Sequence, residues 1–174
     1  MKTGNCQGKK DEASQVQSAL PLESVFSYMQ SALATAHPNL KASVQPVIRA
    51  VHKKNSACSI SVTQLENIMH ELKKINEIGA EAVMLVNFNP NLAHGSINMS
   101  HPGTDNSHWA VVGDVVVDQD LIMTVHIVDT NPGKFSSSWD ISIEQLHVAM
   151  VGDGFIIVSK KDTDVSALEG PHSA

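Results

Sequence analysis

The sequence is poor in several residue types, and each shortage argues against a class of protein. It has only two cysteines, Cys6 and Cys58, which are too few for a disulfide framework or a closed four-ligand zinc site. Twelve basic residues stand against 18 acidic ones and are scattered, which argues against a nucleic-acid partner. The longest apolar runs, such as AVMLV, fall far short of the roughly 20 residues that a membrane-spanning helix needs. We therefore expect a soluble, cytoplasmic protein without a membrane partner.

The length of 174 residues suits one domain, which would bury roughly 70% of the surface of the unfolded chain. Residues 1–15 and 161–174 are polar or small and show no apolar period, so we expect both ends to be disordered. The N-terminal residues also lack the apolar segment of a secretory signal. A single domain over residues 16–160 is the prediction.

Apolar periodicity predicts helices first and strands later. Apolar residues recur at three- and four-residue steps over 22–34, over 40–52 despite Pro46, and from Thr63 to near Gly79, with the short strand ACSISV before the third helix. The second half contains the strand-like runs EAVMLVNF, HWAVVGDVVV, LIMTVHIV and GFIIVS, with one helix, DISIEQLHVAMV, starting at Asp140 or Ser142. This order predicts an α+β domain with an antiparallel sheet.

Two chemically important side chains, His108 and Asp129, lie at the start and the end of neighbouring predicted strands. If Asp118 and Gln119 form a two-residue turn, paired positions sum to 237, as 108 and 129 do, and the two side chains become cross-strand neighbours. A three-residue loop would shift the register by one and separate them. The competing interpretation is that both are loop-edge residues bonded to the backbone.

A carboxylate beside a histidine fixes the tautomer of the imidazole and stabilises its protonated form. The imidazole can then take a proton from a thiol and later return one to a leaving group. His108 and Asp129 are therefore candidates for the general base and the orienting acid of a cysteine-type active site. His126 is predicted to lie on the opposite strand face, with a structural role.

The stretch from Val83 to Ser159 resembles the second half of the catalytic domain of phytochelatin synthases, papain-like enzymes also called glutathione gamma-glutamylcysteinyltransferases. The matching elements occur in order: the strand with Val86-Asn87-Phe88, His108 with Trp109, a strand ending at Asp129, the loop with Lys134 and Phe135, and the helix pattern of Trp139, Leu146, Ala149 and Met150. The resemblance implies a papain-like α+β fold and a Cys-His-Asp triad containing His108 and Asp129. It also implies a transferase or thiol peptidase that acts on glutathione or a related thiol peptide.

The nucleophile is the open question of this hypothesis. In the family, the catalytic cysteine precedes the histidine by roughly a hundred residues, at the N-terminus of a buried helix that lowers its pKa. Cys6 lies 102 positions before His108, but the residues after it are too polar for a buried helix. Cys58 is better explained as a small residue of the core. Ser24, a conceivable substitute for the cysteine, is better explained as a solvent-facing serine. Three explanations stay open: a truncated chain, a degenerate relative that kept the scaffold, or Cys6 as the nucleophile.

No tightly bound cofactor is expected. His94, His101 and His108 recur at steps of seven, but neither this spacing nor the flanking residues fit a closed zinc motif, so we interpret them as loop histidines rather than metal ligands. The resemblance implies that heavy-metal ions take part by binding the thiolates of the substrate. The alternative function is a non-catalytic scaffold or binding domain of the same fold.

Overall fold

The structure is a computed structural model, and it describes residues 22–46, 62–95, 108–129, 136–150 and 154–168. These residues form an α+β fold with an antiparallel sheet, as the apolar patterns predicted. The elements are, in chain order, α1 (Leu22–Ala36), β1 (Leu40–Pro46), α2 (Val62–Glu77), β2 (Ala82–Phe88), α3 (Pro90–Ala93), β3 (His108–Val117), β4 (Met123–Val128), β5 (Ser138–Ser142), α4 (Ile143–Ala149), β6 (Gly154–Lys160) and the 3-10 helix η1 (Ser166–Leu168).

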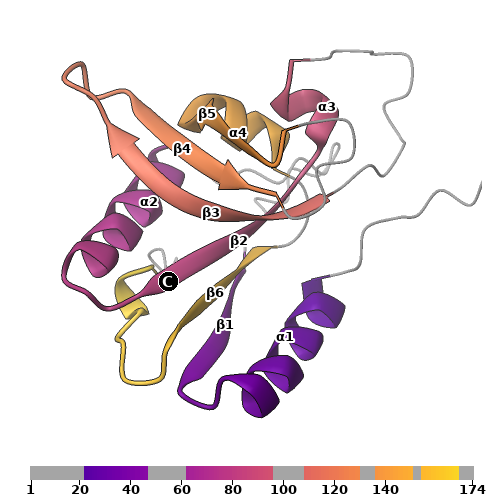
Figure 1. Cartoon of the computed structure of the whole chain (residues 1–174). Coiled ribbons are helices and arrows are strands. Elements are labelled where there is room, and N and C mark those ends of the chain that lie inside the picture. The colour runs from indigo at the N-terminus through magenta and orange to yellow at the C-terminus, as the bar shows by residue number, and fades with distance from the viewer. Residues whose placement is uncertain (1–21, 47–61, 96–107, 130–135, 151–153, 169–174) are drawn as a thin grey trace, which may run out of the picture.

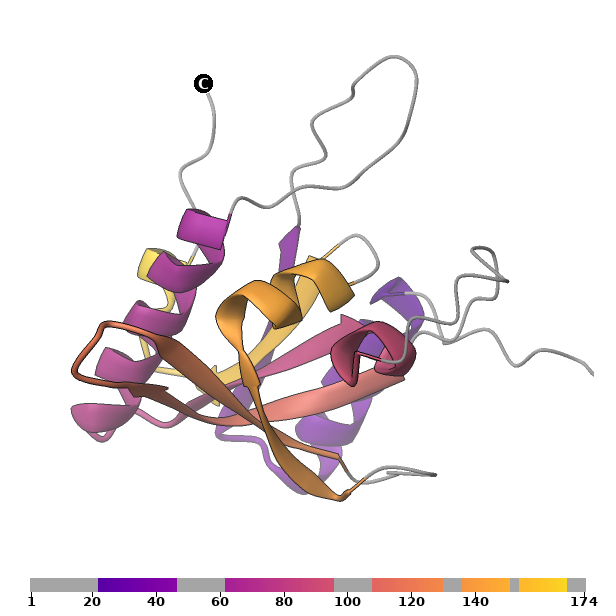
Figure 2. The ribbon, with the colours of Figure 1, turned by 90° about the horizontal axis from the view of Figure 1, so that it is seen from above.

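The six strands form one twisted sheet in the order β1-β6-β2-β3-β4-β5, and every neighbouring pair is antiparallel (Figure 1). The last strand in the sequence, β6, therefore lies between β1 and β2. Helices α2, α3 and α4 cover one face of the sheet, and α1 packs on the other face at the β1 and β6 end (Figures 1 and 2). We call the face under α2, α3 and α4 the core face and the opposite one the outer face.

The main core lies between α2, α4 and the core face. The apolar positions predicted for α2 are all buried: Leu65, Ile68, Met69, Leu72 and Ile75. The helix ends as its sequence predicts, because Gly79 adopts a left-handed conformation with φ of 79°. The N–H groups of Ala80 and Gly79 bond the carbonyls of Ile75 and Asn76, the two-bond arrangement that satisfies the last turn of a helix.

The helix predicted over residues 40–52 is wrong for the part that the structure describes. Residues 40–46 form strand β1, paired with β6 from Leu40↔Lys160 to Pro46↔Gly154. Leu40, Ala42 and Val44 alternate along this strand and pack with α1 in a second apolar cluster on the outer face. The same residues fit a helical and a strand period over so short a stretch, and pairing with β6 decides between them. The predicted strand ACSISV spans residues 57–62. Residues 57–61 lie outside the described residues, and Val62 is the first residue of α2.

After β6 the chain continues as ordered structure, unlike the loose tail expected from residue 161. A turn leads into η1, where Leu168 is fully buried against the main core and Val165 is nearly so. The predicted N-terminal tail, residues 1–15, lies outside the described residues. None of the helices in the described parts of the chain is both long and apolar enough to cross a membrane.

Candidate functional site

The structure brings His108 and Asp129 together at one end of the core face. The Nε2 atom of His108 lies 2.8 Å from Oδ2 of Asp129, within hydrogen-bond distance. The Asp129 side chain is 5% exposed and that of His108 is 26% exposed, so the carboxylate is buried and the imidazole still meets solvent. A carboxylate only accepts hydrogen bonds, so a neutral His108 carries its proton on Nε2 and holds a lone pair on Nδ1. In this pair, the His108–Asp129 dyad, the proton and the lone pair lie where a general base and its orienting carboxylate require them.

The register that predicted this contact is wrong, although the contact exists. Val111 pairs with Val128, so paired positions sum to 239 there rather than 237. The turn is longer than two residues: Oδ1 of Asp118 accepts the N–H groups of Asp120 and Ile122, and Leu121 has φ of 62°. A bulge at Gly113 shifts the pairing once more. In this register His108 and Asp129 are diagonal neighbours on the same face, which long side chains still bridge.

Aromatic rings form the walls beside the dyad. The Phe88 ring, on the strand paired with His108, meets the imidazole edge to face at a centroid distance of 5.8 Å. The Trp139 ring contacts Phe88 at 5.6 Å and His94 at 4.3 Å. The two contacts of Phe88 are edge to face, an arrangement that aromatic pairs prefer, and the contact between His94 and Trp139 is tilted. The sequence identified Trp139 only as part of the family-like helix pattern, and it did not place His94 near Asp129.

His94 is the C-terminal cap of the short helix α3, and the charge of Asp129 affects its pKa. Burial lowers the pKa of His94, and the nearby Asp129 carboxylate opposes that shift. The helix itself is held in place at both ends. At its start, the side chain of Asn89 accepts hydrogen bonds from the first backbone N–H groups of α3. Near its end, the side-chain amide of Gln145 on α4 donates to the Leu92 carbonyl. Asp129 therefore interacts with two histidines: it contacts His108 directly, and its charge acts on His94.

The nucleophile candidates are not brought to the dyad by any described element. Cys6 and Cys58 both lie outside the described residues, as does His101. Ser24 is exposed on α1, which packs on the outer face, so it is separated from the dyad by the sheet. Within the described parts of the chain, no group of three or more histidine, cysteine or acidic side chains could hold a metal ion.

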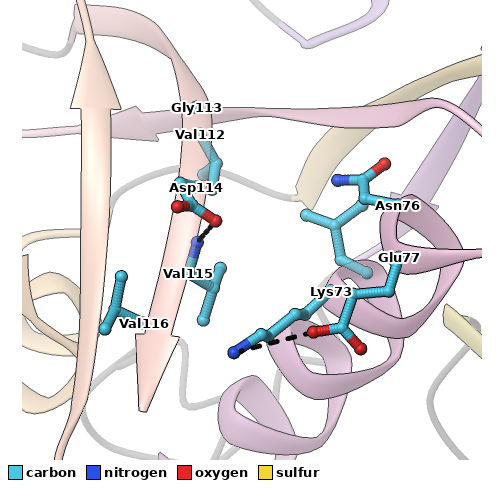
Figure 3. Close-up of a pocket in the computed structure, with 9 residues that line it drawn as sticks. Lys73, Asn76, Glu77, Val112, Gly113, Asp114, Val115 and Val116 are labelled. Carbon is cyan, nitrogen blue, oxygen red and sulfur yellow. Dashed lines mark hydrogen bonds and ion pairs between the residues drawn. The ribbon is translucent and has the colours of Figure 1, made fainter. Parts of the chain in front are cut away.

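A pocket of about 380 Å³ lies elsewhere, between α2 and the middle of β3 (Figure 3). Its walls include Lys73 and Glu77, whose charged groups lie 3.8 Å apart, and Asp114 on β3. The nearest lining residue on β3, Val112, is four residues from His108, which is about 13 Å along a strand. The pocket is therefore separate from the dyad.

Comparisons of the chain with family models, with curated proteins and with solved structures gave no match.

Proposed function

We propose that the His108–Asp129 dyad serves a cysteine nucleophile in an acyl transfer from glutathione or a related thiol peptide, in the manner of phytochelatin synthases. The single observation that carries the proposal is the 2.8 Å contact between the partly exposed imidazole and the buried carboxylate. It is supported by the resemblance of the stretch from Val83 to Ser159 to that family. A papain-like fold belongs to the same proposal.

The chemistry follows from the proton positions in the dyad. The Nδ1 atom of His108 takes the proton of a cysteine thiol, and Asp129 stabilises the imidazolium that results. The thiolate attacks the carbonyl carbon of the cysteine residue in the substrate. The C–N bond to glycine then breaks, and His108 returns its proton to the departing amine. The thioester passes its γ-glutamylcysteinyl group to a second thiol peptide or to water.

The walls of the site suit this reaction. The Phe88 ring packs edge to face against the His108 imidazole, and Trp139 packs against Phe88 in turn, so the imidazole is supported in one orientation. The His108 side chain is 26% exposed, so a thiol can approach it from the solvent side. Cys6 is the candidate nucleophile that this chain itself offers; a truncated chain or a degenerate relative would lack the nucleophile. Heavy-metal ions enter this proposal as part of the substrate, bound to its thiolates, and not as a resident cofactor.

The experiment is glycine release from glutathione by the intact protein, measured with and without Cd²⁺. Glycine release is expected from the native chain, together with its loss in Cys6→Ser and in His108→Ala. Cys58→Ser is the matched control and should retain the activity. No release by the intact protein, with or without Cd²⁺, would contradict the proposal and favour the non-catalytic scaffold. Release that survives Cys6→Ser but not His108→Ala would keep the dyad and reassign the nucleophile.

A further inference from the structure

A second constellation of catalytic residue types lies on the outer face of the sheet, away from the dyad. The Nδ1 atom of His126 on β4 lies 2.7 Å from Oδ1 of Asp140 on β5, and its Nε2 atom lies 2.8 Å from Oγ of Ser138. Both nitrogens of one imidazole are thus engaged, one by a carboxylate and one by a hydroxyl. We call these three residues the outer-face relay.

The hydrogen atoms in the relay have one consistent assignment when His126 is neutral. The Asp140 carboxylate only accepts, so Nδ1 of His126 carries the proton and donates it. The Nε2 atom then holds a lone pair, and the Ser138 hydroxyl donates to it. A serine whose proton points at a histidine, with that histidine oriented by an aspartate, is the arrangement that makes a hydroxyl nucleophilic.

The sheet itself positions the three side chains. His126 and Asp140 are directly paired across β4 and β5, and Ser138, paired with Val128, is the diagonal neighbour of His126. The N–H of Asp129 bonds the carbonyl of Ser137, which makes Val128↔Ser138 and His126↔Asp140 the pairs without backbone bonds between them. In such pairs the side chains stand closest together. The ladder therefore holds the relay by backbone pairing on both strands.

The same alternation directs backbone donors to the edge of the sheet. The N–H groups of Ser138 and Asp140 point away from β4, along the side of β5 that faces no other strand of the described sheet. An oxyanion that forms on a group bonded to Ser138 would find the N–H of Ser138 beside it. On the other side of the imidazole, Gly113 clears space, because a Cβ there would lie 3.3 Å from Cδ2 of His126.

We propose that Ser138 is a nucleophile of the outer face, activated by His126, which accepts acyl groups from activated esters. Its Oγ forms a bond to the carbonyl carbon while its proton moves to Nε2 of His126. The bond from that carbon to the leaving oxygen breaks, and His126 donates the proton to the leaving alcohol. Water then hydrolyses the acyl-serine by the reverse proton transfers. Asp140 is a positioning residue in this scheme.

The exposure of the relay sets the size of the effect. The His126 side chain is 36% exposed and that of Asp140 is 67% exposed, so solvent screens their interaction. We expect the acceleration from His126 to lie near the lower limit for general-base catalysis, about 10²-fold. Asp140→Asn should lower the rate by less than about tenfold, because its charge is largely screened.

A fluorophosphonate probe tests the proposal, since it forms a stable bond to activated serines with loss of fluoride. The intact protein is labelled over a time course, and the adducts are mapped by peptide mass spectrometry. Ser142 is an internal control: it shares the strand and face of Ser138, but its Oγ accepts a hydrogen bond from the backbone N–H of Gln145. Ser138 should react at least about tenfold faster than Ser142. His126→Ala and His126→Gln should both abolish that difference.

Two results would overturn the proposal. One is equal labelling of Ser138 and Ser142 in the native protein. The other is preferential labelling of Ser138 that persists in both His126 variants. The ratio is read within one molecule, so a general loss of stability does not imitate the expected result, and circular dichroism confirms that each variant is folded. The assay uses no glutathione, and its outcome is independent of the function proposed for the dyad.

Discussion

A double-mutant cycle on His108 and Asp129 measures the strength of the dyad without any assumption about its substrate. Removal of either side chain eliminates the 2.8 Å contact, and the cycle subtracts the cavity that each truncation leaves. A hydrogen bond to a charged group contributes about 1.5–3 kcal/mol. Because a quarter of the imidazole is exposed and water competes there, we expect a coupling energy of about 1–2 kcal/mol.

The assay is urea unfolding of the native protein, His108→Ala, Asp129→Ala and the double variant, followed by circular dichroism at pH 7. The matched control is the pair His108 and Asp118, since Asp118 lies at the far end of the hairpin and bonds its own turn. For the control pair, the changes in the free energy of unfolding of the two single variants should add to that of the double variant within about 0.5 kcal/mol. A dyad coupling no larger than that of the control would refute the pairing on which the proposed function depends.

Three further predictions concern stability. Leu146→Ala should lower the free energy of unfolding by about 2–5 kcal/mol in urea, because Leu146 is completely buried on α4. Gly113→Ala should cost about 1–3 kcal/mol in the same assay, since its Cβ would lie 2.8 Å from Cγ2 of Val128; unchanged stability would refute this close approach. Burial lowers the pKa of His94 below its usual 6.5, so the folded state resists its protonation and stability is full above that pH. As the pH falls from 6.5 toward the lowered pKa, native stability should decline relative to that of His94→Gln, and a pH-independent difference would contradict the burial of the ring.

Patterns that depend on one element alone were readable from the sequence. The apolar face of α2 and its end at Gly79 follow from local period and glycine conformation, and the cap of α4 at Ser142 was one of two predicted positions. Each of these features needs only residues within a few positions of one another. The structure agrees with them for that reason.

Features that depend on pairing between distant residues were not readable. The segment from Leu40 to Pro46 becomes a strand because β6, more than a hundred residues later, lies beside it. The hairpin register depends on the Asp118 side chain and the Gly113 bulge, neither of which a count of loop residues reveals. The predicted contact between His108 and Asp129 exists although the predicted register was wrong, because diagonal neighbours lie on the same face of the sheet. The outer-face relay was missed because no strand was predicted at residues 138–142, where a helix was expected to begin at Asp140 or Ser142. Without β5, His126 has no partner strand on that side.

The most direct test of the central claim is mass spectrometry of the intact protein after brief incubation with glutathione and Cd²⁺ followed by acid quenching. The account predicts a γ-glutamylcysteinyl thioester on a cysteine of this chain, Cys6 being the proposed site, and its absence in His108→Ala. An intact protein that never carries the adduct while free glycine stays at background would contradict the account.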